Sequence, residues 1–395
     1  MALAFVRIIP EGTHYRFVRL RNMAFAFSIA AVFGSMVAFF TLGINLGIDF
    51  KGGGNIEIET EAPANLTKIG SIVRGLGLGE VEVREFGSPT EVLIRFERQT
   101  STDPEVNEEK LQQTAARKVH TALYQSYSDI KIEFDGDRLA SVTSPNALDL
   151  EKGQAAMSSL GVPGLELAAG EDANSLVLKL PEVVIDRKTG PELQQQLFGQ
   201  AQYKLLETYS TLTSQRTEIV GPKVSGELVR SGITAVLGAL FCMLIYIWLR
   251  FEWQFSVGAV VALIHDVLLT IGMFSLTRIE FNLASIAAIL TIVGYSMNDT
   301  VVVYDRIREK LRKFKKMALP DLIDLAINKT LSRTSITSLT TLLALVSLYF
   351  LGGEALRGFA ITMIWGVVVG TYSSIFIAAP VLLFLGVDRT EMEES

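Results

Sequence analysis

The chain has 395 residues, of which 49% are hydrophobic and 20% are charged, and its net charge at neutral pH is −6. This composition excludes a disordered chain, a collagen-like fibre and a disulfide scaffold, and the length allows two or three domains. The charge is unevenly distributed. Residues 47–228 hold 28 acidic and 18 basic side chains, a net of −10, whereas the remainder holds 14 and 18, a net of +4. An acidic middle region therefore separates two apolar flanks that lean basic.

Six apolar segments are long enough to cross a membrane as helices, because a bilayer core of about 30 Å requires roughly 20 helical residues. The first is too long for the apolar core of a signal peptide, so we expect it to be an uncleaved anchor. The six spans are predicted at 23–46, 231–249, 255–276, 283–304, 334–351 and 359–385.

The distribution of lysine and arginine predicts the orientation of these spans. Most basic residues of the flanks lie in the N-terminal tail and in the loop after the fourth span, whereas the short loops on the opposite side hold only Arg278 and Arg357. Both termini are therefore expected in the cytoplasm and the acidic region outside it. The predicted divisions are a tail at 1–22, the first span at 23–46, an outer domain at 47–228, five spans within 229–385 with a cytoplasmic loop at 305–333, and a tail at 386–395.

The sequence contains no motif of a common enzyme class. GxxxxGK[ST], HExxH, CxxC and GxSxG are all absent, and the only cysteine, Cys242, lies in the second predicted span. We therefore expect a protein that is not an enzyme, that holds no metal or other cofactor, and that draws on a gradient or on a partner for energy.

The acidic region reads as a repeated module. Residues 55–134 follow the order strand, helix, strand, strand, helix, strand, which is typical of the ferredoxin-like βαββαβ plan. The pattern recurs about 84 residues later, where Lys152 corresponds to Lys68 and Tyr209 to Tyr127. Chance recurrence of a common pattern is the alternative. We predict two antiparallel modules whose open edges could accept an extended peptide. Their approximate limits are 55–136 and 139–221.

Ionisable side chains inside a membrane span cost at least a few kcal/mol, so they mark candidate functional positions. Asp299 in the fourth span and Arg333 at the start of the fifth are expected at similar depth. Burial disfavours an ionised carboxylate and a nearby guanidinium favours it, so such a pair could load and release a proton. A static pair that fixes helix packing is the alternative. Asp266, near the middle of the third span, is a second candidate, and His265 a third. Adjacent residues point about 100° apart on a helix, so these two are not expected to share one polar face.

Hydroxyl side chains concentrate on the fifth span. Thr334, Ser338 and Thr341 share one helix face and could line a hydrated path or bond to neighbouring helices. Residues 366–370 form a GxxxG packing motif in the sixth span. An amphipathic segment after Pro320 predicts a short helix on the membrane surface. The basic run before it is interpreted as a topology signal that also meets anionic lipid, and nucleic acid is not expected as a partner.

Taken together and in order, several motifs resemble one family, the SecF subunits of protein-export machinery. The resemblance covers both membrane portions and the ends of the outer domain. Its positions include Asp49, Gly52 and Gly53 after the first span, Tyr295 and Asn298 in the fourth, and Asp305 and Arg306 beyond it. The matching stretches are 47–53, 85–88, 218–224, 250–253, 265–267, 294–300, 305–309, 333–338 and 352–353.

This resemblance implies a helical polytopic membrane protein with the architecture of half an RND exporter, driven by protons at Asp299 and Arg333. It implies action late in protein translocation across the bacterial inner membrane. The implied partners are SecD as an obligate partner, the SecYEG channel, YajC, the unfolded polypeptide in transit and the lipid bilayer. The outer domain departs from the family pattern, because it is longer than the usual single module by close to one repeat.

Two other functions are compatible with the residues alone. One is a membrane-anchored periplasmic docking module whose spans hold it in place without proton coupling. The other is half of an RND-type exporter of small molecules.

Overall fold

A computed structural model describes residues 13–100, 107–135, 139–181 and 190–387 of the chain. It divides into two compact units. The membrane unit comprises Met1–Phe50 and Gly226–Ser395, and the inserted unit comprises Lys51–Ser225. These limits lie a few residues inside those predicted for the outer domain.

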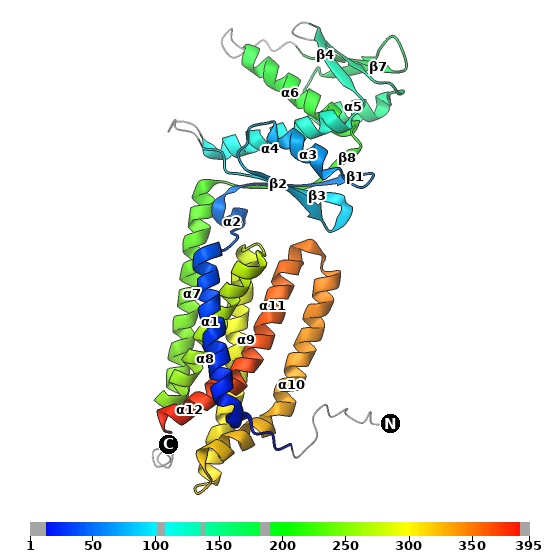
Figure 1. Ribbon diagram of the computed structural model, residues 1–395. Coiled ribbons are helices and arrows are strands. Elements are labelled where there is room, and N and C mark those ends of the chain that lie inside the picture. Colours follow the sequence, from blue (N-terminus) through cyan, green and yellow to red (C-terminus); the bar gives the residue numbers. More distant parts are fainter. Residues whose placement is uncertain (1–12, 101–106, 136–138, 182–189, 388–395) are drawn as a thin grey trace, which may run out of the picture. The chain divides into compact units, whose positions relative to one another are not determined.

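Six helical spans form the membrane unit in the described chain, which confirms a polytopic helical membrane protein (Figure 1). Helices α8, α9 and α11 are the most buried, whereas α1, α7 and α10 expose most of their apolar surface. The spans are α1 Arg21–Leu42, α7 Pro222–Arg250, α8 Trp253–Thr277, α9 Leu283–Lys313, α10 Leu319–Leu351 and α11 Gly353–Ser373, the last continued by a π-helical turn η2 Ser374–Ala378 and by α12 Ala379–Leu385.

The segment that follows α1 is tied to the start of α9. Asp49, in the short helix α2 Ile48–Lys51, accepts a hydrogen bond from the backbone N–H of Leu283 at 2.9 Å. Gly47 donates its backbone N–H to the carbonyl of Phe281 at 2.8 Å. The first N–H groups of a helix have no partner inside the helix, and a carboxylate there also meets the positive end of the helix dipole. Asp49 therefore anchors the chain where it leaves the membrane unit.

The prediction of a surface helix after Pro320 is wrong. The helix α10 already begins at Leu319, so most of the predicted cytoplasmic loop is helical. Its apolar face is fully buried in the protein, with Leu322 and Ile323 in the core, rather than laid on lipid. Asp324 accepts a 2.9 Å bond from the backbone N–H of Val18, in the turn η1 Phe17–Leu20. Periodicity identified the apolar face but could not say that another part of the chain covers it.

The inserted unit contains two four-stranded sheets in which every neighbouring pair is antiparallel. The first has the order β2-β3-β1-β8 and the second the order β4-β5-β7-β6. In chain order the elements are β1 Gly53–Thr60, α3 Leu66–Arg74, β2 Val81–Phe86, β3 Ser88–Phe96, α4 Glu108–Tyr127, β4 Lys131–Asp135, β5 Leu139–Thr143, α5 Leu150–Ser158, β6 Glu166–Ala169, β7 Ser175–Lys179, α6 Gly190–Thr208 and β8 Leu212–Val220.

The two sheets do not follow the limits predicted for the repeats. The strand after α4, β4, pairs with β5 in the second sheet, and the strand after α6, β8, pairs with β1 in the first. The last strand of each predicted repeat therefore pairs in the sheet formed mainly by the other repeat. The chain crosses between the sheets at Ser128 and Ser210, which form an isolated antiparallel bridge. Strands joined by a short connection pair readily as a hairpin, and this explains why β4 joins β5 rather than β1.

Similar contacts occur in the two predicted repeats, at the residue pairs that the sequence comparison matched. The Lys68 Nζ lies 4.3 Å from the ring centre of Tyr127, and the Lys152 Nζ lies 5.8 Å from that of Tyr209. Asn65 caps α3 and Asp149 caps α5, each through the backbone N–H of the corresponding lysine. Both contacts and both caps thus fall at positions that the predicted sequence correspondence pairs.

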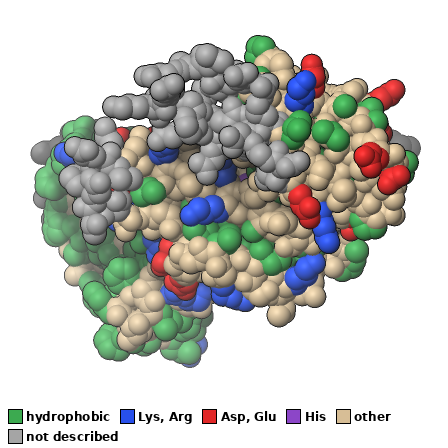
Figure 2. All heavy atoms as spheres, turned by 90° about the horizontal axis from the view of Figure 1, so that it is seen from above, with side chains coloured by type: hydrophobic (Ala, Val, Ile, Leu, Met, Phe, Trp, Pro, Cys, Tyr) green, Lys and Arg blue, Asp and Glu red, His purple; other side chains and the backbone are tan. Residues whose placement is uncertain are grey.

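The helices of the inserted unit lie between its two sheets (Figure 1). Helices α3 and α4 pack on the first sheet, α5 packs on the second, and α6 contacts both α4 and α5. The rings of Tyr124 and Tyr203 meet edge to face at 5.6 Å where α4 crosses α6. One hydrophobic core therefore serves both sheets. The face seen in Figure 2 carries charged side chains of both signs, with no single-sign patch on its described surface.

A deletion can test how the strands are exchanged. Removing residues 129–209 and joining Ser128 to Ser210 keeps every strand of the first sheet, because these two residues already face each other. We expect the shortened membrane protein to fold, but to be less stable because α4 loses its contact with α6. Removing residues 138–221 instead takes away β8 and leaves β1 unpaired on one edge, so this variant should be degraded. Limited proteolysis of the purified chains measures both, and equal resistance would contradict the exchange.

His120 makes the stability of the inserted unit depend on pH. Its ring is buried beside Thr217, whose hydroxyl lies 2.9 Å from Nε2, and burial lowers the pKa of His120 below the ordinary value of 6.5. The unfolded chain then takes up the proton more readily, so stability should fall as the pH drops from about 7.5 to about 5.5. We expect His120→Gln to flatten this dependence, measured by hydrogen exchange of the β8 amides, while His14→Gln, at an exposed position, leaves it unchanged.

Candidate functional site

Two glycines bring α11 unusually close to α9. A side chain on Gly366 would place its Cβ 2.1 Å from Cγ1 of Ile292, and one on Gly370 would lie 3.0 Å from Cβ of Ser296. Small residues four apart let helix backbones approach in a membrane, where no hydrophobic effect drives them together. The GxxxG motif therefore does more than pack: it sets the distance across which polar side chains of α9 and α11 can meet.

Asp266 is the centre of the first polar cluster, where α8, α9 and α11 meet. Its side chain is fully buried, at 0% exposure. The Ser296 and Ser373 hydroxyls donate to Oδ2, the latter at 2.7 Å, and Nδ1 of His265 lies 2.9 Å from Oδ1. The expectation that His265 and Asp266 would not share a polar face is therefore wrong, because the imidazole ring is long enough to reach back to its neighbour.

A second cluster joins α9, α10 and α11 through hydroxyl groups. The Tyr295 hydroxyl donates to the Ser338 hydroxyl at 3.2 Å, and the latter lies 2.8 Å from the hydroxyl of Thr371. Hydroxyls both donate and accept hydrogen bonds, so this chain of three groups can reverse direction without moving a heavy atom. Each cluster includes a group from α9 and a group from α11.

Asp299 lies one turn beyond Tyr295 on α9 and is 3% exposed. Thr371 lies within reach of its carboxyl group, but Oδ2 has no hydrogen-bond partner in the described protein, and neither has the buried hydroxyl of Thr334. The α9 and α10 helices run in opposite directions. Asp299 lies one turn after Tyr295 on α9, and Thr334 lies one turn before Ser338 on α10. The bond between Tyr295 and Ser338 therefore places Asp299 and Thr334 at the same level.

Arg333 is exposed on α10 and does not form a direct ion pair with Asp299 among the described residues. Its positive charge nevertheless acts on the carboxyl group. Arg333 and Asp299 therefore attract each other electrostatically without touching. A buried carboxyl group faces an arginine that lies on the surface of this single chain.

Most of the other predicted site residues lie outside the two polar clusters or at their edges, on α9 and α10. On the hydroxyl face of α10, Thr334 and Ser338 are buried, whereas Thr341 is half-buried and donates to the carbonyl of Thr337 in its own helix. Asn298 is exposed on α9, away from both clusters. Asp305 and Arg306 lie near the end of α9, where they pair with Arg250 and Glu309 respectively.

The glycine pair has a local conformational role. Gly52 and Gly53 have φ values of 75° and 123°, which side-chain-bearing residues rarely adopt. A Cβ on Gly53 would also lie 2.5 Å from the backbone carbonyl oxygen of Phe96. These two positions let the chain turn into β1 against β3.

A π-helical turn follows the clusters and was not predicted. It spans Ser374–Ala378, directly after Ser373, and the Tyr304 hydroxyl donates to the carbonyl of Ala378 at 3.0 Å. Gly258 leaves room for that hydroxyl, since a Cβ there would lie 2.3 Å from it. Such turns often occur at functional sites. Sequence reasoning also missed Thr371 and Ser373, although their position just after the GxxxG motif offered a signal.

This arrangement is suited to holding and passing protons inside the bundle. Asp266 accepts bonds from two hydroxyls and Asp299 lies within reach of the Thr371 hydroxyl, and a hydroxyl can bond to a carboxyl group in either protonation state. Within the described residues, no group of three or more His, Cys, Asp or Glu side chains could hold a metal ion.

Two family descriptions match the chain. Residues 200–388 match the C-terminal part of the protein export membrane proteins SecD/SecF, and residues 37–64 match the SecD/SecF GG motif. The chain is 37% identical over 384 residues to protein translocase subunit SecF of Cereibacter sphaeroides, covering 97% of this chain and 93% of that protein. It is 34% identical to SecF of Rickettsia rickettsii, covering 95% and 94%. Both alignments include the inserted unit.

Solved structures give the same relationship. The chain is similar to the crystal structure of SecDF, a translocon-associated membrane protein from Thermus thermophilus, with a TM-score of 0.57 and 28% identity over 95% of this chain. A second SecDF structure, in the super-membrane-facing form, gives a TM-score of 0.52 and 29% identity over 97% of this chain. This chain spans 39% and 40% of those two longer chains.

The close approach of α9 and α11 can be tested by filling it. We expect Gly366→Val to destabilise the membrane unit by about 1–3 kcal/mol, the usual cost of overpacking, because its side chain would overlap Ile292. The matched control is Gly238→Val on α7, where a Cβ would meet nothing within 4 Å. Thermal unfolding of the purified chain in detergent compares the two. Equal midpoints would show that α9 and α11 are not in tight contact.

Proposed function

Since this chain belongs to the SecD/SecF family of protein-export membrane proteins and is a SecF-type accessory subunit of the Sec translocase, we propose that it couples proton movement to protein export. Asp299 is the proton carrier, Asp266 is a second proton-binding carboxyl group, and His265 adjusts the charge of Asp266. The coupling promotes a late stage of translocation. The chain does this without enzymatic chemistry and without a metal or organic cofactor.

The observation that carries this proposal is the pair of unsatisfied buried atoms, Oδ2 of Asp299 and the hydroxyl of Thr334. A buried polar atom without a partner costs roughly 1–3 kcal/mol, and more when it is charged. Protonating the carboxyl group removes its charge, and a water molecule between the two would satisfy both groups.

Arg333 supports coupling to a partner rather than action by one chain. An exposed guanidinium beside apolar side chains is costly in lipid, and Ile336, less than one turn after Arg333 on α10, is exposed. We propose that SecD covers this part of α10 and adds polar groups beside Arg333. Movement between the two subunits would then change the attraction between Arg333 and Asp299, and with it the protonation of Asp299.

The proposal also includes the location of the chain in the membrane and its partners. The chain lies in the bacterial inner membrane with both termini in the cytoplasm, and the inserted unit, built from two ferredoxin-like modules, lies in the periplasm. There it meets the unfolded polypeptide that leaves SecYEG, with YajC in the same assembly. In the alternative function, a docking module without proton coupling, the inserted unit would still bind the polypeptide, but Asp299 would not carry protons.

Asp299→Asn separates these two functions. We expect this variant to assemble with SecD and to lose the part of protein export that depends on an imposed proton gradient, because an amide cannot take up the proton. Export without a gradient should not change. Export by reconstituted vesicles, with and without the gradient, measures both parts.

The matched control is Asp321→Asn, which removes an exposed carboxylate from the first turn of α10. It should keep full gradient dependence. Gradient-dependent export that survives Asp299→Asn would reject proton coupling and leave the docking function.

A further inference from the structure

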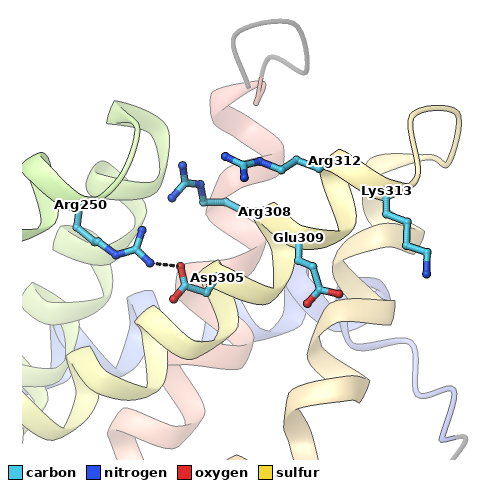
Figure 3. A pocket seen from close by; sticks show the side chains of 6 residues that line it. All are labelled: Arg250, Asp305, Arg308, Glu309, Arg312 and Lys313. Carbon is cyan, nitrogen blue, oxygen red and sulfur yellow. Dashed lines mark hydrogen bonds and ion pairs between the residues drawn. The ribbon is translucent and has the colours of Figure 1, made fainter. Parts of the chain in front are cut away.

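A charged cleft of about 680 Å³ lies at the end of the bundle where α7 and α9 terminate, well outside the two polar clusters (Figure 3). Four cationic side chains line it against two carboxylates, which gives the cleft an excess of positive charge. The lining residues are Arg250 from α7 and Asp305, Arg308, Glu309, Arg312 and Lys313 from α9.

Three guanidinium groups converge in this cleft. Arg308 and Arg312 extend from successive turns of α9 toward the end of α7 that carries Arg250 (Figure 3). Arg250 bonds to Asp305 at 2.8 Å, and Arg308 lies 3.5 Å from the Glu252 carboxylate.

The remaining charges leave a surplus of cations. Glu309 is engaged by Arg306 and Lys310. Among the described carboxylates, none pairs with Arg312. The planar guanidinium fork is the side chain best suited to bind phosphate oxygens through two bonds, so the cleft has unused capacity for an anion.

The cleft lies at a membrane–water boundary. Trp248 and Trp253 flank Arg250 in the chain and are 73% and 54% exposed. Exposed tryptophans of polytopic membrane proteins gather at the level of the lipid head groups, where the ring meets both apolar and polar surroundings. The anion that reaches this position in greatest abundance is therefore the phosphate of a phospholipid.

An apolar groove of about 370 Å³ lies between α7 and α8, further along the two helices from the end that carries the cleft. Its lining on α7 ends at Leu244, six residues before Arg250. At 1.5 Å per helical residue, the groove begins about 9 Å from the cleft along α7. That spacing suits a lipid whose head group occupies the cleft and whose acyl chain follows the groove. The groove is lined by Leu237, Leu240, Phe241, Leu244, Val260, Leu263, Ile264, Val267 and Leu268.

We propose that this cleft binds the head group of an anionic phospholipid, with Arg250, Arg308 and Arg312 around its phosphate and one acyl chain in the groove. The excess of cations favours an anionic lipid such as phosphatidylglycerol. A zwitterionic lipid would bring an ammonium group into a site in which four positive charges already exceed two negative ones.

Lipid retention by the purified full-length chain tests the proposal, measured by native mass spectrometry and by the shift in thermal midpoint on adding lipid. Phosphatidylglycerol should bind and stabilise, whereas phosphatidylcholine and inorganic phosphate should do so far less. Arg312→Gln should weaken phosphatidylglycerol binding about fivefold, the value of one basic side chain at a lipid surface. Its control, Lys329→Gln, removes an exposed charge of α10 outside the cleft and should leave binding unchanged.

A second pair of variants tests the acyl groove. Leu240→Trp fills it and should reduce phosphatidylglycerol retention, while Ile233→Trp, exposed on α7 outside the groove, should not. Equal binding of phosphatidylcholine would overturn the choice of an anionic lipid. Equal stabilisation by inorganic phosphate would show a simple anion site, and insensitivity to Arg312→Gln would remove the cleft from lipid binding altogether.

Discussion

The membrane unit depends on one constraint, the cost of holding carboxyl groups away from water. Asp266 is fully buried, and it is tolerable there because hydroxyls from two other helices donate to it. Gly366 and Gly370 let α11 approach α9 beside these hydroxyls, and Gly370 lies directly against Ser296. Close helix packing and the polar contacts of a buried carboxyl group therefore occur at the same place.

The same constraint is only partly met at Asp299, whose carboxyl group has fewer hydrogen-bond partners than that of Asp266. Asp266 has partners on both oxygens, whereas Asp299 retains an unpaired oxygen beside an equally unpaired threonine hydroxyl. Arg333, which could balance the charge, faces outward on α10. The centre is thus incomplete within one chain, in keeping with a family in which SecD and SecF work together.

The inserted unit shows how a domain can be lengthened while its first sheet keeps all four strands. The two halves exchange their last strands, and the helices between the sheets share one core. The crossing segments meet at Ser128 and Ser210, so the added half enters and leaves at neighbouring points. This geometry allows the first sheet to keep its four strands and its connection to the membrane unit through β1 and β8.

The sequence by itself determined the elements that depend on local patterns. Apolar runs longer than a bilayer is thick gave the six spans, alternation and turn residues gave most strands, and ionisable residues within spans identified Asp266 and Asp299. Only the tertiary structure decided which distant segments meet. It placed β4 and β8 in each other's sheets, covered the apolar face of α10 with protein, and kept Arg333 apart from Asp299. Such choices depend on the combined packing of segments far apart in the chain, which periodicity within one segment does not encode.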